Sequence, residues 1–229
     1  MFSFPPQTAF GKVVPKSRIY THANPPRRVR GQFVSQLSEI IWAHKLSPET
    51  LHLPARPGVP EIQIFDLHLR ATSLDDDVLL AIDRAVPYPA IHRLLSKELG
   101  IAYSAAFKRP SETDSSQWVV GPRFTSAFAP LPSTPLPPLP AALDLGHLSA
   151  ALMAPLLPLL ARPGETLAAH VERSETFLRL RRQIEKLTSR MHREKQFNRK
   201  VDLNQQLKPL QAEMNAIIAT KIDKPGVKA

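Results

Sequence analysis

Cysteine is absent from this chain of 229 residues. Without a thiol the chain has no disulfide, no thiolate nucleophile and no cysteine-ligated zinc, so a metal would need histidine and carboxylate ligands. Long apolar runs are absent too, because the richest, Leu148 to Leu160, contains two prolines and is shorter than the ~20 residues of a membrane span. The N-terminus lacks the basic and apolar segments of a secretory signal. These features predict a soluble, cytoplasmic protein without membrane contact.

Ligand patterns for metals and phosphate groups are also missing from the sequence. None of the eight histidines belongs to an i,i+4 pair or a His-x-His motif, and the eight glycines form no phosphate-binding loop. His68 and Asp66 share a strand face, but no nucleophile accompanies them. The sequence therefore predicts no cofactor, no metal and no catalytic residue.

A divergent metal-dependent nuclease stays open as the weakest alternative. Such enzymes combine an Asp with Glu-x-Lys on an adjacent strand, whereas this chain has Glu61-Ile62-Gln63 and no clear Asp on a preceding strand. Asp75 to Asp77 could hold a cation, but their place at the start of a predicted helix accounts for them without one.

Basic residues are distributed unevenly along the chain, which has a formal charge of +10. Residues 1–38 hold six Lys/Arg and no acid, residues 39–165 hold ten against thirteen acids, and residues 166–229 hold fourteen against seven. A near-neutral middle between two basic ends is typical of a core domain with two anion-facing extensions.

The middle of the chain predicts an α+β core. Four strands are expected, over 61–70, 90–95, 101–108 and 117–124, and the apolar phase of the first shifts as it does at a bulge or in a strand buried on both faces. An amphipathic helix is indicated by the spacing of Phe33, Leu37, Ile40, Ile41 and His44. A second helix is predicted to begin at the N-cap Ser73 and to end before Pro87. Short connections favour a mostly antiparallel sheet with flanking helices.

Composition divides the chain into six segments. They are a proline-rich basic arm (1–30), the α+β core (31–127), a proline-rich linker (128–142), an Ala/Leu-rich kinked helix (143–163), a basic helical hairpin or coiled coil (164–221) and a tail (222–229).

Two apolar stripes at helical spacing follow Gly164, and on one straight helix they would lie about 130° apart. A hairpin that turns near Phe197 brings the stripes face to face, and Pro209 argues against one straight helix because an interior proline costs ~3 kcal/mol. The lack of a turn glycine argues the other way. A hairpin is favoured over one long kinked helix. The residues predicted to pack against a partner helix are Leu180, Ile184, Leu187, Met191, Leu203, Leu207, Leu210 and Met214.

The strongest functional signal lies between Arg179 and Lys200, where nine Lys/Arg stand against two Glu. At about 100° per residue, six of these cations share the face opposite the apolar stripe, and few acids are placed to neutralise them. They are Arg179, Arg182, Lys186, Arg190, Arg193 and Lys200. Phe197 could stack on a base, although a role in closing the hairpin end is favoured. The predicted nucleic-acid-binding residues are Arg179, Arg182, Lys186, Arg190, Arg193, Lys195, Arg199 and Lys200, together with Arg27, Arg28 and Arg30 of the arm.

Five segments carry a family resemblance. They are IIWAHKLSPETLHL (40–53), EIQIFDLHLR (61–70), AIDRAVPYP (81–89), IAYSAAFK (101–108) and MHREKQFNRKVDLNQQL (191–207). In this order they resemble an uncharacterised bacterial family, catalogued as a domain of unknown function, whose members lie near helicase and DNA methyltransferase genes in restriction-type or anti-phage loci. The resemblance implies a defence-associated partner of DNA-processing enzymes and supplies no catalytic residue. The proline-rich stretch 128–140 departs from the family pattern.

Together these features predict an accessory nucleic-acid-binding subunit of a bacterial defence system rather than an enzyme. Its expected partners are the backbone of DNA or RNA and a helicase- or methyltransferase-type protein, and the C-terminal helices also allow a homo-oligomer. The alternative is a protein–protein adaptor that uses the C-terminal helices without touching nucleic acid.

Overall fold

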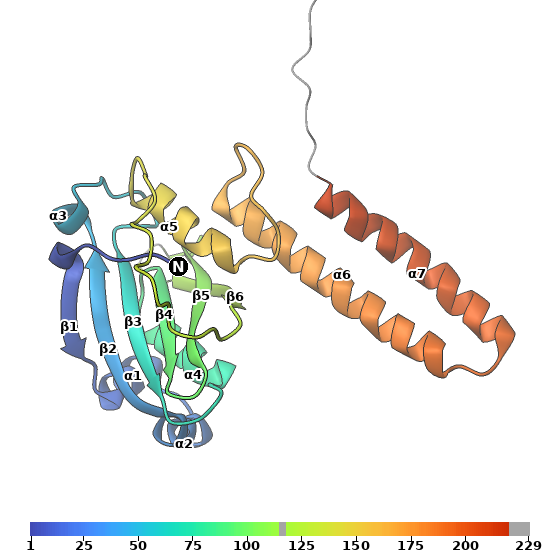
Figure 1. Ribbon diagram of the computed structural model, residues 1–229, viewed down its shortest axis with the longest axis horizontal. Helices are drawn as coiled ribbons and strands as arrows, with labels where there is room; N and C mark the ends of the chain where they lie inside the picture. The colour runs from blue at the N-terminus through green and yellow to red at the C-terminus, as the bar shows by residue number, and fades with distance from the viewer. Residues whose placement is uncertain (115–117, 220–229) are drawn as a thin grey trace, which may run out of the picture. The chain divides into compact units, whose positions relative to one another are not determined.

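The computed structural model describes residues 1–114 and 118–219, and the chain divides into two compact units, Met1–Leu156 and Leu157–Ala229. The first unit is a sheet with helices, and the second is a helical hairpin (Figure 1). The first residue of the predicted strand 117–124, the end of the predicted hairpin segment and the predicted tail lie outside the described residues. In the described part of the chain, no helix has both the length and the apolar content needed to cross a membrane.

The six strands of the sheet lie side by side in chain order (Figure 1). They are β1 (Ala9–Val13), β2 (Leu37–Leu46), β3 (Ile62–Leu69), β4 (Ala90–Ser96), β5 (Gly100–Pro110) and β6 (Trp118–Thr125). Every neighbouring pair is antiparallel except β3 and β4, which are parallel. A parallel pair needs a crossover connection, and α4 (Asp76–Ala85) lies in it. The predicted α+β class with a mostly antiparallel sheet is confirmed.

Both faces of the sheet carry a hydrophobic core. The other helical segments of this unit are α1 (Lys16–Ala23), α2 (Arg27–Gln36), α3 (Pro48–Leu51), α5 (Leu145–Met153) and the short 3-10 turns η1 (Pro6–Thr8) and η2 (Ala154–Leu156). Phe65 and Leu67 of β3 belong to a cluster with residues of α1, α2 and α4, whereas Ile62 and Ile64 belong to a second cluster with residues of α5. Burial on both faces explains why β3 is apolar nearly throughout.

The N-terminal residues do not form the extended arm that their prolines predict. Residues 1–30 contain β1, α1 and the start of α2, and Ile19 and Val29 are buried in the core. Pro15 and Pro26 stand at the N-caps of α1 and α2, with φ of −60° and −62°. Their restricted φ suits the entry to a helix, so in this segment proline marks helix starts rather than an extended chain.

The amphipathic helix predicted from Phe33 to His44 is also wrong. Only its beginning is helical, because α2 ends at Gln36 and β2 starts at Leu37. The buried residues of β2 recur every third position, at Leu37, Ile40, Ala43 and Leu46. Two register shifts against β3 produce this spacing, since each one resets the alternation of a strand and imitates a helical period.

The start of α4 and the proline-rich segment differ from prediction in detail. The N-cap of α4 is Asp75 rather than Ser73, and the Asp75 carboxylate accepts hydrogen bonds from Gln32 and Gln36 of α2 at 2.5 and 2.6 Å. In the proline-rich segment, Ala129 forms an isolated β-bridge with Ile101, and the Pro137 carbonyl accepts the Ser3 amide at 2.8 Å. The segment is therefore bonded to the sheet unit at two places.

The second unit is built from α6 (Leu167–Arg193) and α7 (Phe197–Ile218), two helices that lie side by side and are joined by residues 194–196 (Figure 1). The predicted hairpin is confirmed over the single long helix. Its turn comes a few residues before the predicted one, and Pro209 lies inside α7 rather than at a break.

Candidate nucleic-acid interface

Five cations of α6 form one longitudinal row, which we call the basic stripe. They are Arg179, Arg182, Lys186, Arg190 and Arg193, and all five are exposed. At about 100° per residue the row occupies an arc of about 80°, and at 1.5 Å per residue it is about 21 Å long. The helix thus holds the stripe as a straight track of positive charge.

No acid among the described residues neutralises the basic stripe. In the region from Arg179 to Lys200, Arg181 pairs with Glu185 at 2.9 Å, and both partners are well exposed. None of the five stripe residues lies within 4.0 Å of a carboxylate oxygen belonging to the described residues. An exposed row of like charges repels itself, so an external anion would stabilise it.

The apolar positions of the two helices form the hairpin core. Leu180, Leu203 and Leu207 are buried, at 2, 8 and 3% exposure. The remaining members of the predicted helix-packing set are half-buried, and they are Ile184, Leu187, Met191, Leu210 and Met214. The helix partner of this set is supplied within the chain, because α6 and α7 pack on one another.

The turn of the hairpin is organised by Glu194. Its Oε1 accepts the backbone N–H groups of Lys195 and Gln196, each at 2.9 Å. The Gln196 amide, with that of Lys195 and the charges of Arg199 and Lys200, keeps the pKa of Glu194 below its usual value against partial desolvation. An acceptor that holds two amides at the entry to a helix replaces the turn glycine that the sequence lacks.

The three remaining C-terminal cations of the predicted set belong to the turn and to α7. Lys195 lies in the turn, while Arg199 and Lys200 lie in the first turn of α7, and all are exposed. Lys200 was predicted to share one helical face with the basic stripe, and this is wrong because the chain reverses before it. We call Lys195, Arg199 and Lys200 the tip cluster.

The open end of the hairpin is tied by arginines. Nη2 of Arg162 donates to the carbonyls of Ile217 and Ala219 at 2.8 and 3.1 Å, which caps the C-terminal end of α7. Arg173 of α6 forms a bidentate pair with Glu165, both contacts being 2.7 Å, and this pairing lowers the pKa of Glu165 to about 2. Both ends of the hairpin are therefore restrained by specific polar contacts.

The three N-terminal arginines do not form a basic arm. Arg28 pairs with Asp77 of α4, and Arg30 donates to the Pro25 carbonyl and the Asn24 side chain at 3.0 and 3.1 Å. These two side chains brace the start of α2. Arg27 is exposed at the first position of that helix. The structure therefore does not join Arg27, Arg28 and Arg30 into one free cationic cluster.

Comparison with known families covers nearly the whole chain. A family model described as a domain of unknown function, DUF4391, matches residues 2–214. The chain belongs to the DUF4391 family. No curated protein and no solved structure matches it. The family match includes both the sheet unit and nearly all of the hairpin, so in this DUF4391 protein the basic stripe and the tip cluster lie within the family region.

A buried charged network in the sheet unit of this DUF4391 protein was missed by the sequence analysis. The carboxylate of Asp83 in α4 is contacted by His92 of β4 at 3.0 Å, by Lys108 of β5 at 2.9 Å and by Arg123 of β6. Lys108 also donates to the carbonyls of Val86 and Tyr88, at 2.8 and 3.1 Å. We call Asp83, His92, Lys108 and Arg123 the Asp83 network.

Burial and charge act in opposite directions in the Asp83 network. Burial raises the pKa of Asp83, but His92, Lys108 and Arg123 outweigh it and hold the pKa well below its usual range. Burial lowers the pKa of His92 and that of Lys108, although Asp83 opposes both shifts. An ionised carboxylate only accepts, so the proton of a neutral His92 lies on Nε2. The side chains of Asp83, His92 and Lys108 are fully buried. We therefore assign the network to the stability of the sheet unit.

Two carboxylates considered for catalysis, Glu61 of the nuclease alternative and Asp66 beside His68, are engaged with neighbouring side chains. Glu61 lies 3.3 Å from Nζ of Lys45 and accepts from Gln63. Asp66 is held by Arg93 of the adjacent strand, with the Nη2–Oδ2 contact at 2.7 Å, and no pairing with His68 is formed there. Residues 1–114 and 118–219 contain no group of three histidine or acidic side chains placed to hold a metal ion.

Proposed function

We propose that this DUF4391 protein binds the phosphate backbone of nucleic acid through the basic stripe, as an accessory subunit of a larger DNA-processing enzyme in bacterial defence. The observation that carries the proposal is the unneutralised stripe, which displays five cations over about 21 Å of rigid helix. The phosphates of one DNA strand follow each other every ~3.4 Å along the duplex axis. A track of this length therefore spans about six phosphates.

Binding of this kind is driven by counterion release. Each phosphate neutralised by Lys or Arg frees condensed cations from the nucleic acid, and the contact reads charge rather than base sequence. Five such contacts predict an affinity that falls roughly 500-fold between about 50 and 200 mM salt on a duplex. The proposal assigns no chemical step to the protein.

The protein partner is proposed from the family resemblance, which associates such chains with helicases and DNA methyltransferases. An accessory subunit of this type would hold the nucleic acid while the partner acts on it. The expected site of action is the cytoplasm, where these enzymes meet DNA.

The test is a titration of labelled DNA and RNA by fluorescence anisotropy at two salt concentrations. Wild type is compared with a variant in which Arg182, Lys186, Arg190 and Arg193 are changed to Glu. A matched control makes the same change of charge on exposed cations of the sheet unit, at Arg18, Arg70, Arg84 and Lys97. Loss of binding in the stripe variant alone supports the proposal, and equal affinities in all three proteins would remove the stripe from nucleic-acid binding.

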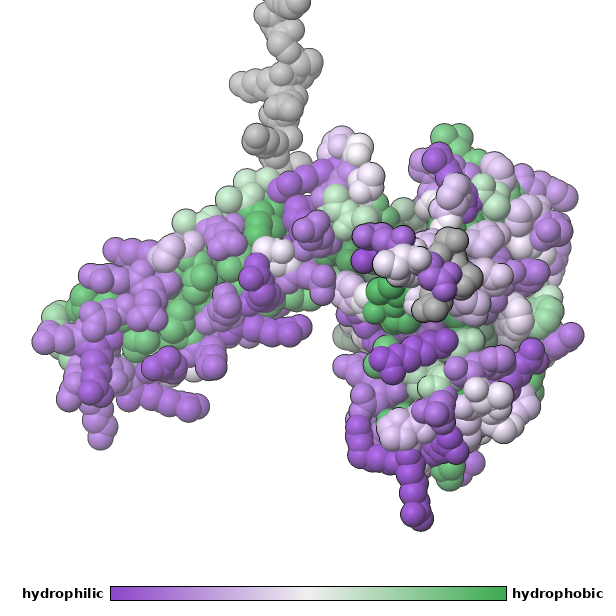
Figure 2. All heavy atoms as spheres, turned by 180° about the vertical axis from the view of Figure 1, so that it is seen from behind, coloured by the Kyte–Doolittle hydropathy of each residue, from purple (hydrophilic) through white to green (hydrophobic). Residues whose placement is uncertain are grey.

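A second candidate function, a protein–protein adaptor, is favoured by one specific observation. The half-buried residues of the hairpin core form an apolar band along the hairpin, bordered by polar side chains (Figure 2). Two helices alone cannot cover such a band, and a third helix could. Changing Ile184 and Leu187 to Gln should then abolish capture of the partner enzyme and leave nucleic-acid affinity unchanged, which separates this function from that of the stripe.

A further inference from the structure

The ring of Phe197 is exposed beside the hairpin turn. Phe197 is the first residue of α7 and is 77% exposed, which excludes the favoured prediction that it closes the hairpin end. It lines an open depression of about 540 Å³ together with Met191, His192, Lys200, Val201 and Asn204. Glu194 already organises the turn through two backbone amides. The face of the Phe197 ring is thus accessible to a ligand that enters this depression.

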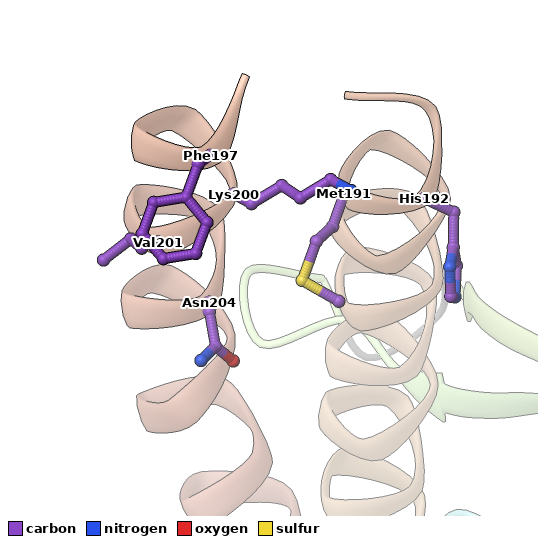
Figure 3. A pocket seen from close by; sticks show the side chains of 6 residues that line it. All are labelled: Met191, His192, Phe197, Lys200, Val201 and Asn204. Atoms are coloured by element: carbon purple, nitrogen blue, oxygen red, sulfur yellow. The ribbon is translucent and has the colours of Figure 1, made fainter. Parts of the chain in front are cut away.

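Lys200, which lines the same depression as Phe197, indicates what kind of ligand fits. Figure 3 shows Lys200 extending from α7 towards Met191 on α6, with the Phe197 ring beside Val201 on α7. Arg193 precedes the turn, and the tip cluster surrounds it in sequence. An aromatic face among cations is the arrangement with which proteins hold an unpaired base and its neighbouring phosphates.

We propose that the hairpin tip is a stacking platform for an unpaired base, so that the ligand of this protein is single-stranded nucleic acid. Phe197 takes the face of one base, and Lys200 with the other residues of the tip cluster contacts the adjacent phosphates. The basic stripe then guides the rest of the strand along α6. This inference rests on the proposed function, because it specifies which nucleic acid the same basic helix prefers.

Duplex and single-stranded nucleic acids differ in whether a base face is accessible to the Phe197 ring. Bases in a duplex are stacked on their neighbours and paired, so the ring gains nothing from them without unstacking. Bases of a single strand present their faces, and stacking on an aromatic ring tolerates any base. Phe197 therefore contributes to binding of a single strand and not of a duplex.

The experiment uses the full chain and three labelled oligonucleotides of equal length: an oligothymidylate, a strand with abasic sites in its middle, and a duplex. The abasic strand keeps the phosphates and removes the bases. We expect wild type to bind the oligothymidylate about 5- to 150-fold more tightly than the abasic strand, which is the range of one base–aromatic stack. Phe197→Ala should lose this preference and keep its affinity for the duplex.

Two further variants separate stacking from simple loss of apolar surface. Phe197→Trp keeps an aromatic face and should retain the preference, with its indole emission quenched by the oligothymidylate. Phe197→Leu keeps apolar surface without a ring and should behave as Phe197→Ala. The matched control is Ile218→Ala, which truncates an exposed apolar residue at the opposite end of α7 and should change nothing.

The outcomes distinguish this inference from the function on which it rests. If wild type binds none of the three oligonucleotides, the proposed function itself fails. If wild type binds the base-containing and abasic strands equally and Phe197→Ala alters neither, the stacking platform is refuted while backbone binding stands. An equal loss for strand and duplex in Phe197→Ala would also refute stacking, since it would assign Phe197 to the shape of the tip.

Discussion

Nζ of Lys108 lies 2.9 Å from Oδ1 of Asp83, and both side chains are completely buried. Through this contact β5 is joined to α4, and the same carboxylate brings in β4 through His92 and β6 through Arg123. Charges placed in the interior are costly unless every partner is present. The Asp83 network therefore couples the packing of one helix to three neighbouring strands.

Lys108→Met should destabilise the sheet unit strongly. The substitution leaves Asp83 with fewer partners and also removes the donor to the carbonyls of Val86 and Tyr88. Breaking a buried ion pair on one side costs about 3–5 kcal/mol, because the remaining charge is uncompensated. Urea unfolding followed by tryptophan fluorescence measures this loss, since Trp42 and Trp118 both lie in the sheet unit.

The control for Lys108 is the next residue along the same strand. Arg109 is half-exposed and pairs with the well-exposed Glu112 at 2.9 Å. Exposed pairs contribute about 0–1 kcal/mol, so Arg109→Met should unfold at nearly the wild-type urea concentration. Equal destabilisation of the two variants would mean that burial of the Asp83 network is not the source of the effect.

The stability of the sheet unit should fall on acidification because of His92. Its pKa is lowered from 6.5 by burial, so the unfolded chain takes up a proton at a higher pH than the folded one. A group with a depressed folded pKa contributes stability above its unfolded pKa and loses it as the pH falls. The loss begins as the pH drops through about 6.5 and has a slope of at most about 1.4 kcal/mol per pH unit.

His92→Gln provides the comparison, because glutamine does not titrate. The variant should be less stable than wild type at neutral pH and should show a shallower decline between roughly pH 6.5 and 5. Asp83, whose pKa is also depressed, should add a second decline below about pH 4 in both proteins. Parallel curves for the two proteins through the upper range would show that His92 is not the titrating group.

Local sequence patterns predicted β3 to β6, α4 and the hairpin, because in these elements the period of the apolar residues matches the secondary structure. β2 was missed since its register shifts place buried residues every third position, which resembles a helix. The N-terminal segment was missed because its prolines precede helices instead of interrupting them. In both segments a local pattern, apolar spacing in one and proline content in the other, has a different meaning once tertiary contacts are formed.

The basic stripe could be predicted from the sequence, whereas the position of Lys200 and the Asp83 network could not. Spacing alone places the five cations of the basic stripe on one face, but the position of Lys200 depends on where the chain turns. The position of the hairpin turn is set by Glu194, which accepts two backbone amides at the entry to α7 and replaces the usual glycine. The Asp83 network joins residues from four elements, and no local pattern connects them. The sequence signal for this network is Lys108, which continues the alternation of the buried residues Ala102, Ser104 and Ala106 along β5.

Leu207→Ala should loosen the hairpin and leave the sheet unit intact. Leu207 is 3% exposed and is one of the few fully covered residues in the hairpin core. Truncating a buried leucine costs about 2–5 kcal/mol, which is a large share of the stability of a small unit. Amide hydrogen exchange should accelerate throughout α6 and α7, while tryptophan fluorescence of the sheet unit stays unchanged. Gln206→Ala, at an exposed neighbouring position, is the control and should exchange as wild type does.

Single neutralisations should show which cations of α6 contact phosphate. Arg190→Gln removes a stripe cation with no acidic partner in the described residues, whereas Arg181→Gln removes a cation of the same helix that is paired with Glu185. The slope of log affinity against log salt should decrease by about 0.9 on duplex, or about 0.7 on a single strand, for Arg190→Gln. For Arg181→Gln the change should be much smaller, because in wild type Arg181 lies outside the stripe and its charge is already paired with Glu185. Equal changes in slope would show that total charge, rather than the geometry of the stripe, governs binding.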